Sequence, residues 1–149
     1  MSAALPYAAV GASLLAARQA SAIGSFNQAV AERNATIAEQ EAEAQKKLTT
    51  YNLNKFNQSF EKLQSRTRVS LLKSGVELSG TALKILQSNA EQAELQRNVI
   101  EYNGQVAEAK KLEEANFARI SGTLARRQAN LQALGYISQA GTSLLNMKQ

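Results

Sequence analysis

Glutamates are the side chains of this sequence that could do acid–base chemistry. All twelve acidic residues are Glu, and Glu113 with Glu114, or Glu39 with Glu43, could in principle act as an acid and a base in one site. Carboxylates at this spacing are ordinary on a solvated helix surface, and nothing in the sequence around them marks a cleft. We therefore predict that these pairs are surface residues and that the protein is not an enzyme.

The residue types that the sequence lacks exclude most other site chemistries. It contains no Cys, no His and no Asp. This removes thiol and imidazole nucleophiles, zinc sites of the usual Cys/His kind and the Asp-led loops that bind calcium or magnesium. We expect no catalytic, cofactor-binding or metal-binding residues and no cofactor.

The composition favours an all-α protein. The strong helix formers Ala, Leu, Gln, Glu, Lys and Arg are abundant, and Pro6 is the one proline. Aromatic residues make up 5% of the 149 residues, which is little material for a globular core. We therefore predict helices that pack along narrow seams.

Glycines and small polar residues near the midpoint predict a tight turn. Gly75 can take the left-handed conformation that closes a helix, and Val76 can make the accompanying hydrophobic contact. After Gly80, either Ser79 or Thr81 can cap the next helix by accepting a backbone hydrogen bond. We predict a long antiparallel, coiled-coil-like hairpin of two helices of about 65 residues, each roughly 100 Å long at 1.5 Å per residue, and expect it to be oligomeric.

This prediction treats residues 1–149 as a single elongated helical domain. Its parts are a small-residue-rich tip (1–24), a first arm (25–74), the turn (75–81) and a second arm (82–149). With the turn centred near Glu77, Gly11 is expected opposite Ser143, and Val30 opposite Leu124.

Apolar residues recur every seven positions in both arms, and we expect them to form the buried seam. The first arm contributes Val30, Ile37, Ala44 and Tyr51, continued by Phe56, Phe60 and Leu63. The second arm contributes Leu86, Ala93, Ile100 and Ala107 with Leu83 and Ala90, and later Phe117, Leu124 and Leu131 with Ile120 and Leu134 between them.

Small residues recur at every fourth position near both ends of the chain. The first stripe is Ala4, Ala8, Ala12, Ala16, Ala20 and Gly24, and the second is Ala125, Ala129, Ala133 and Gly141. Because small residues at this spacing let a neighbouring helix approach closely, we expect both stripes to serve helix packing or assembly. The first stripe is expected to pack against Ala129, Ala133 and Gly141. An Ala-rich helix that reflects helix propensity alone is the alternative interpretation.

Four further glycines lie inside the predicted helices, where each costs about 1 kcal/mol relative to Ala. These are Gly24, Gly104, Gly122 and Gly135. We expect them to mark close packing or bendable points. Gly104 follows Tyr102 and Asn103 in a polar stretch, so it is expected to kink or break the second arm, with a tolerated surface glycine as the equal alternative.

Two sets of basic residues are candidates for charge interactions. Lys46–Lys47 would lie nearly opposite Lys110–Lys111, which disfavours an isolated hairpin unless these lysines face outward or meet another subunit. Glu39, Glu41 and Glu43 of a neighbouring subunit could then neutralise them. Arg126–Arg127 could anchor at anionic headgroups, pair with Glu32 or remain solvated, and we favour solvated charge.

Contact with membranes and nucleic acid is expected to be secondary. The N-terminal stretch is uncharged up to Arg18, but it lacks the positive start of a signal peptide and is weakly hydrophobic for a membrane span, so conditional insertion as an oligomer fits better. The net charge of +5 permits non-specific contact with DNA. No DNA-reading motif is present.

Several stretches resemble the internal virion proteins of short-tailed bacteriophages, of the small internal virion protein B type. They are residues 74–86, 125–129 and 141–145, together with the uncharged opening followed by residues 34–40. Members of that family often have Ser-Pro after the second turn glycine, where this chain has Thr81 and Ala82. The resemblance implies a helical, multi-copy protein that is packaged inside the capsid near the portal and ejected ahead of the genome. The lytic transglycosylase activity of the family belongs to a much larger companion.

From composition and this resemblance we expect a phage internal core protein that assembles into a homo-oligomeric ring or tube with other core proteins and the portal. During DNA ejection it would leave the capsid ahead of the genome and form part of a conduit for viral genome delivery through the host cell envelope, with the host membrane as a conditional partner. Its location would be the virion, and then the host envelope. The alternatives are a purely structural portal or tail adaptor or core scaffold without a membrane role, and a cellular coiled-coil binding module.

Overall fold

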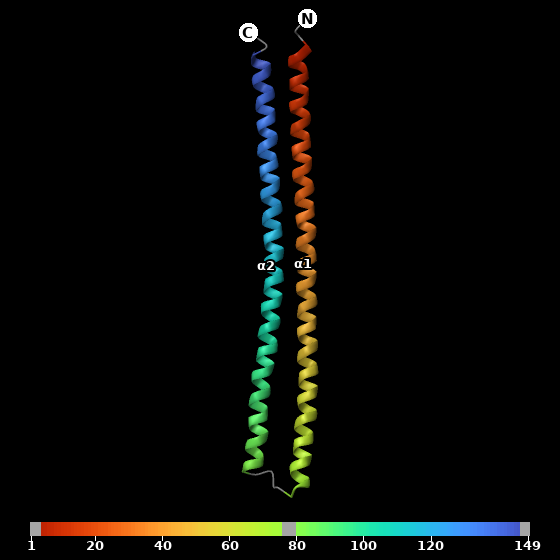
Figure 1. Ribbon diagram of the computed structural model, residues 1–149, viewed down its shortest axis with the longest axis vertical. Helices are drawn as coiled ribbons and strands as arrows, with labels where there is room; N and C mark the ends of the chain where they lie inside the picture. Colours follow the sequence, from red (N-terminus) through yellow and green to blue (C-terminus); the bar gives the residue numbers. More distant parts are fainter. Residues whose placement is uncertain (1–3, 76–79, 147–149) are drawn as a thin grey trace. The chain divides into compact units, whose positions relative to one another are not determined.

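The computed structural model describes residues 4–75 and 80–146. Helix α1 spans Ala4–Lys73 (70 residues) and helix α2 spans Thr81–Asn146 (66 residues), and the described residues include no strand. The two helices form an all-α helical hairpin (Figure 1), which confirms the fold predicted from the composition and the central glycines.

Both helices are continuous, for reasons that are visible in the sequence. Pro6 falls in the first turn of α1, where a backbone N–H would have no partner within the helix, so its missing donor costs nothing. The second arm was expected to kink or break at Gly104, but α2 passes through this residue without interruption. Gly104 is buried, and its packing partner, described below, holds this part of the helix in place.

The turn begins where the sequence predicts it. Gly75 has a φ of 71°, in the left-handed region, and its N–H donates a hydrogen bond to the carbonyl of Leu72 at 3.1 Å. This is one of the two hydrogen bonds of a Schellman helix end, which glycine adopts without strain. The predicted contact of Val76 lies outside the described residues.

Gly80, rather than Thr81 or Ser79, stands at the cap position of α2. Its carbonyl accepts the first hydrogen bond of the helix, from the N–H of Lys84 at 3.2 Å, and its φ is 57°. Thr81 is therefore the first helical residue, which corrects the predicted side-chain cap. Ser79 lies outside the described residues.

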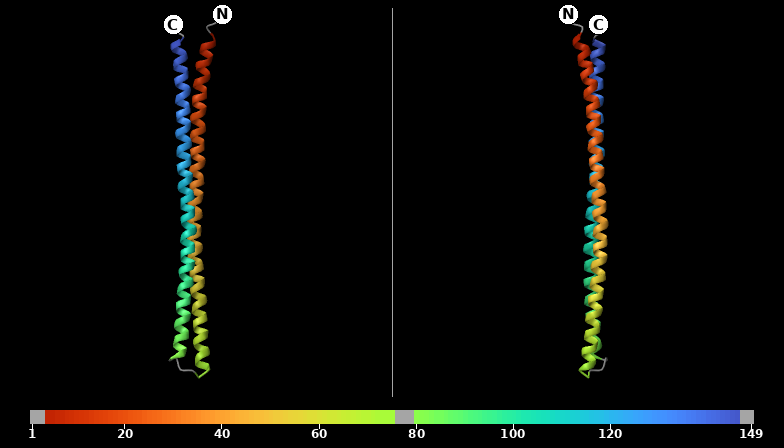
Figure 2. Two further views of the ribbon diagram at one scale, coloured as in Figure 1. Left: turned by 60° about the vertical axis from the view of Figure 1, so that its left-hand side comes forward. Right: turned by 90° about the vertical axis from the view of Figure 1, so that its right-hand side faces the viewer.

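The chain divides into two compact units, each built from a segment of α1 and an antiparallel segment of α2 (Figure 2). Unit 1 combines residues 1–38 with 113–149, and unit 2 comprises residues 39–112, which include the turn.

The buried residues of both units are small. In unit 1 they are Ala17, Gly24, Ala35, Ala38, Ala115, Gly122, Ala133 and Ala140, and in unit 2 they are Ala42, Ala82, Ala93 and Gly104. No polar or charged residue is buried among those whose burial is described. The core of the hairpin is therefore a seam of methyl groups and bare backbone.

The predicted seam of large apolar residues is wrong in unit 1 and partly right in unit 2. In unit 1 Val30, Ile37, Phe117, Ile120, Leu124, Leu131 and Leu134 are all exposed. In unit 2 Phe56, Phe60, Leu86, Ile100 and Ala107 are half-buried and Ala93 is buried, whereas Ala44, Tyr51, Leu63, Leu83 and Ala90 are exposed. The physical reason is that alanine and glycine already occupy the contact line in unit 1, and the helices approach too closely there to admit larger side chains.

Candidate functional site

The closest helix contacts of unit 1 are made at two glycines. A Cβ added at Gly24 would overlap the Cβ of Ala129, and one added at Gly122 would lie 2.6 Å from the Cβ of Ala31. Real Cβ atoms do not approach so closely, so each glycine leaves room for the methyl group of the facing helix. At these two positions of unit 1, the methyl group of an alanine on one helix therefore packs against the bare backbone of a glycine on the other.

Four alanines continue this packing into the centre of unit 1. Ala35, Ala38 and Ala115 form a buried cluster, and the half-buried Ala118 packs against it. Ala35 is 0% exposed, so its methyl group is fully enclosed. Burying one methylene or methyl contributes about 0.8 kcal/mol, against about 1.5–3 kcal/mol for a whole Val, Leu, Ile or Phe side chain. The seam therefore yields little hydrophobic stabilisation for each residue buried.

Unit 2 contains the same kind of contact. A Cβ at Gly104 would overlap the side chain of Thr49, whose hydroxyl donates a hydrogen bond to the carbonyl of Gln45 at 2.9 Å. The hydroxyl oxygen, the methyl group and the Cβ of Thr49 all face Gly104, and the hydroxyl still bonds to its own helix. Gly104 is a packing residue here, and not a break.

These contacts give the register of the helices within each unit. Val30 was expected opposite Leu124, a register that would place Glu32 opposite Gly122, and the observed neighbour of Gly122 is Ala31, one residue earlier along α1. The predicted register is thus correct to within one residue in unit 1. The other expected pair, Gly11 with Ser143, involves a side chain outside the described ones.

The predicted small-residue stripes are divided between the seam and the surface. Gly24 and Ala133 are buried, Ala16, Ala20, Ala125, Ala129 and Gly141 are half-buried, and Ala12 is exposed. Ala4 and Ala8 belong to α1, but their side chains are outside the described ones. Gly24 packs against Ala129 as predicted, whereas a Cβ at Gly141 would meet nothing within 4 Å. A straight seam cannot follow a four-residue spacing, because the helix repeats every 3.6 residues.

The actual contact line consists of small residues, and part of it follows a seven-residue repeat. On α1, Ala17, Gly24, Ala31 and Ala38 recur every seven residues with the buried Ala35 among them, and on α2, Ala115, Gly122 and Ala129 do so and are followed by the buried Ala133 and Ala140. Sequence reasoning missed this line because it searched the heptads for large apolar residues. The repeat itself was the signal that could have revealed it.

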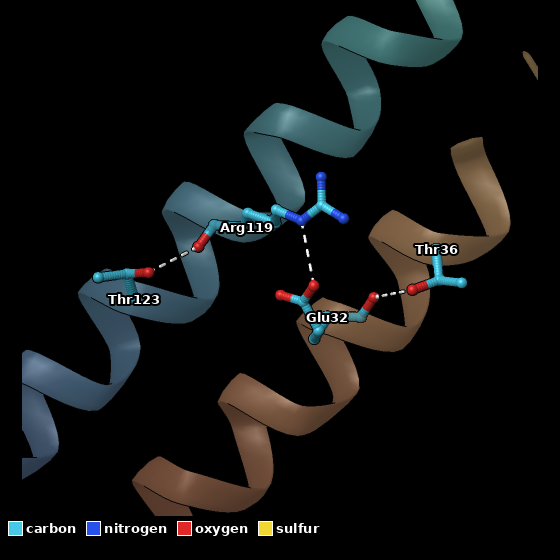
Figure 3. A network of polar contacts seen from close by, with 4 residues as sticks. All are labelled: Glu32, Thr36, Arg119 and Thr123. Carbon is cyan, nitrogen blue, oxygen red and sulfur yellow. Dashed lines mark hydrogen bonds and ion pairs between the residues drawn. The ribbon is translucent and has the colours of Figure 1, made fainter.

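Polar side chains bridge the two helices beside the seam. The Nε of Arg119 donates a hydrogen bond to Oε1 of Glu32 at 3.1 Å (Figure 3). On the two helices, the hydroxyls of Thr36 and Thr123 donate to the carbonyls of Glu32 and Arg119, each at 3.0 Å. Glu32 thus pairs with Arg119, and not with Arg126 or Arg127 as one alternative held.

Arg126 makes one hydrogen bond to the facing helix. Its Nη1 donates to Oε1 of Gln28 at 2.9 Å. Arg126 and Arg127 are both exposed and the Gln28 amide is neutral, so the charge of these arginines is open to solvent, in line with the favoured interpretation.

The lysines of unit 2 find carboxylates in their own chain. Lys111 pairs with Glu41 of the facing helix at 2.8 Å, and Lys47 pairs with Glu43 one turn away at 3.6 Å. Lys111 and Lys47 therefore need no carboxylate from a neighbouring subunit. The antiparallel register itself brings Glu41 to Lys111.

The candidate glutamates are surface side chains, and the described residues contain no cluster that could hold a metal ion. Glu43, Glu113 and Glu114 are exposed and Glu39 is half-buried, so these glutamates lie at the surface as predicted. Within residues 4–75 and 80–146 no three His, Cys, Asp or Glu side chains gather where they could hold a metal ion. In the same residues, no helical segment has both the length and the hydropathy needed to span a membrane.

The surface of unit 1 carries the large apolar side chains that the seam does not use. On α1 they are Leu14, Leu15, Ile23, Phe26, Val30 and Ile37, and on α2 they are Phe117, Ile120, Leu124, Leu131, Leu134, Tyr136 and Ile137. Their exposed fractions run from 40% for Tyr136 to 71% for Phe117.

A shallow groove lies between the two helices of unit 1. The α1 residues Ala16, Ala20 and Ile23 line it together with Ala125, Ala129 and Tyr136 of α2. The small-residue stripes thus contribute to the floor of an interhelical groove, beside exposed apolar side chains.

Comparisons with protein-family models, with curated proteins and with solved structures found no match.

Proposed function

We propose that this protein is an internal virion protein of a short-tailed bacteriophage, which assembles in several copies with other core proteins near the portal. On infection it would leave the capsid ahead of the genome and form part of the conduit through the host cell envelope. The observation that carries the assembly role is the placement of side chains in unit 1, where small residues join the helices and large apolar residues point outward. A chain that keeps its large apolar residues outside its own core has surface to offer to neighbours.

The phage assignment rests on the resemblance of residues 74–86, 125–129 and 141–145 and on the uncharged opening of the chain. Both turn glycines within residues 74–86 have a positive φ, so this stretch contains the residues that the hairpin turn requires. The polar Gln, Asn and Lys side chains on the remaining surface would line a wet channel or face solvent.

The test is to follow the protein through infection in the phage that encodes it. Particles are purified, genome release is triggered in vitro, and the protein is quantified by mass spectrometry in full particles, emptied particles and the released fraction. We expect it in full particles and in the released fraction. Retention in emptied particles would replace the ejection role with that of a structural adaptor, and absence from full particles would refute a virion role.

A second experiment addresses the envelope step. Purified protein is added to liposomes loaded with a self-quenching dye, with and without anionic lipid. Release of the dye at micromolar protein supports the conduit role. A protein that is ejected but never permeabilises liposomes, under any condition, contradicts it.

A further inference from the structure

Most of the net positive charge of the chain lies in one short segment of α1. Residues 55–73 contain five Lys or Arg and one Glu, so this segment carries +4 of the net charge of +5. It belongs to unit 2, and its basic residues are all exposed: Lys55, Lys62, Arg66, Arg68 and Lys73. The charge of the protein is therefore concentrated on the surface of a single helix segment.

Four of these cations form a line along α1. Lys55, Lys62, Arg66 and Lys73 are separated by seven, four and seven residues, so at about 3.6 residues per turn their directions lie within about 40° of one another. The line is about 27 Å long at 1.5 Å per residue. We call these four residues the basic stripe.

The basic stripe faces away from α2. The half-buried residues Phe60 and Leu71 of the same segment lie about 140–160° around the helix from the centre of the stripe. Two shallow hollows lie along the stripe, and the described residues that line them all belong to α1. Arg66 lines both hollows, Lys62 lines one of them and Lys73 lines the other. The outer surface of α1 is therefore open to a partner at the stripe.

The chain supplies no carboxylate to neutralise the basic stripe. Within α1, no residue three or four positions from any of its members is acidic, although ion pairs on a helix form at this spacing. None of the four cations pairs with a carboxylate among the described residues, whereas Lys47, Lys111 and Arg119 do so elsewhere in the chain. Lys62 and Arg66 are four residues apart, a spacing at which like charges repel. An anionic partner would therefore remove a repulsion that folding leaves in place.

We propose that the basic stripe binds the phosphate backbone of double-stranded DNA without reading its sequence. Lys and Arg side chains contact phosphate oxygens, and serine hydroxyls donate further hydrogen bonds to them. Ser65 and Ser70 line the hollows beside the cations. The line of charge covers the length of about eight base pairs at 3.4 Å each.

The side chains around the stripe favour duplex DNA over a membrane surface or a single strand. A helix that binds a lipid surface inserts large apolar side chains, and Val69 is the one apolar residue among the described residues that line the two hollows. Single strands are held by bases stacked on aromatic rings, and the same lining residues include no aromatic. Contact with the phosphates of a duplex requires neither kind of side chain.

The basic stripe deepens the proposed function, on which it rests for its biological role, because it names the surface through which the protein would meet the genome. It lies in unit 2, whereas the apolar side chains that support the assembly role lie in unit 1. The two roles therefore use different residues and can be tested separately.

The test is the fluorescence anisotropy of a labelled duplex of about 30 base pairs, titrated with the full-length protein at about 50 to 200 mM salt. Four phosphate contacts predict a slope of about −3.6 in a plot of log K against log salt, which is a loss of roughly 100-fold in affinity over this range. Lys62→Gln/Arg66→Gln should bind at least about 10-fold more weakly and should reduce the slope by about 2. The matched control is Arg33→Gln/Lys46→Gln, which removes the same two residue types from exposed positions of α1 outside the stripe.

A wild-type protein that does not bind the duplex at the lowest salt overturns the proposal, and so does a control pair that lowers affinity and slope as much as the test pair. A strong preference for one of two duplexes of unrelated sequence contradicts recognition of the backbone. Binding to anionic vesicles that is lost in the test pair alone, without any binding of duplex, would assign the stripe to lipid headgroups instead.

Because the chain has no cysteine, a single label tests the contact with every cation in place. An environment-sensitive dye on Ser70→Cys should respond to added duplex, and the same dye on Ser21→Cys, an exposed α1 position in unit 1, should not. Equal responses of the two labels contradict the stripe. A protein that binds duplex through the stripe but is absent from full particles would refute the proposed function alone, and an ejected protein that never binds duplex would refute the stripe alone.

Discussion

A methyl group placed on Gly122 would lie 2.6 Å from the Cβ of Ala31, closer than packed carbon atoms come. Position 122 is therefore glycine because the facing helix has already used the space. The same helix contains Gly135, where an added methyl group would meet nothing within 4 Å. The two glycines form a matched pair for testing the seam.

We predict opposite effects of alanine at these two positions. Gly135→Ala should raise the free energy of unfolding by about 1 kcal/mol, because alanine is the better helix former. Gly122→Ala should lower it by about 1–3 kcal/mol, because overpacking outweighs that gain. Urea unfolding followed by circular dichroism at 222 nm measures both changes.

The swap Ala31→Gly/Gly122→Ala completes this test. It moves one methyl group across the seam, so it should recover most of the stability lost in Gly122→Ala. Failure of the swap to recover stability would show that the contact does not limit packing at position 122.

Replacing alanines of α1 by leucine should affect stability differently depending on whether the alanine lies in the seam. Ala17 is 5% exposed and buried in unit 1, whereas Ala12 is exposed. Ala17→Leu should lower the free energy of unfolding by about 1–3 kcal/mol through overpacking, and Ala12→Leu should change it by less than about 0.5 kcal/mol. Thermal unfolding of both variants decides the matter, and equal losses would argue for a seam along the four-residue stripe instead.

Replacing the turn glycine Gly75 should lower stability only through the backbone conformation that this position requires. Nothing lies within 4 Å of a Cβ at Gly75, and its φ is 71°. Gly75→Ala should therefore cost about 1–2 kcal/mol, the penalty of the left-handed conformation, while Gly75→Asn should cost less, because Asn tolerates that conformation. The order of the three unfolding midpoints, Gly above Asn above Ala, is the measurement. An Ala variant as stable as the wild type would be inconsistent with a left-handed residue.

The Glu32–Arg119 pair should contribute little to stability. The side chains are 57% and 38% exposed, and exposed pairs typically couple by about 0.2–1 kcal/mol. A double-mutant cycle with Glu32→Gln and Arg119→Gln should give a coupling energy in this range, and it should fall as salt rises to 1 M. A coupling well above 1 kcal/mol that resists salt would mean that the pair is more strongly desolvated than its exposure implies.

The fold could be predicted from the sequence because it depends on local signals. The central glycines have backbone conformations that other residues adopt at a cost, so Gly75 marks the end of a helix without reference to anything distant. Helix propensity then extends both arms, and with the turn located, the register follows to within one residue.

The contact line could not be predicted by searching for large apolar side chains. Val30 and Ile37 repeat every seven residues, as a buried seam would, yet they are exposed beside the buried Ala38. Two heptad patterns run along α1 at neighbouring positions, and hydrophobicity alone favours the larger residues. What decides between them is how closely the helices approach, which depends on both helices at once and is not a property of either segment.

The buried residues of the hairpin have a consequence for its motion. Alanine and glycine lose no side-chain rotamer freedom on burial, whereas larger side chains lose up to about 2 kcal/mol each. Closing the seam around Ala35, Ala38 and Ala115 therefore freezes no side-chain torsion, and opening it releases none. Around this cluster the helices can separate and rejoin without any change of side-chain rotamer, whereas in unit 2 the half-buried Phe56, Phe60 and Leu86 have side-chain torsions of their own.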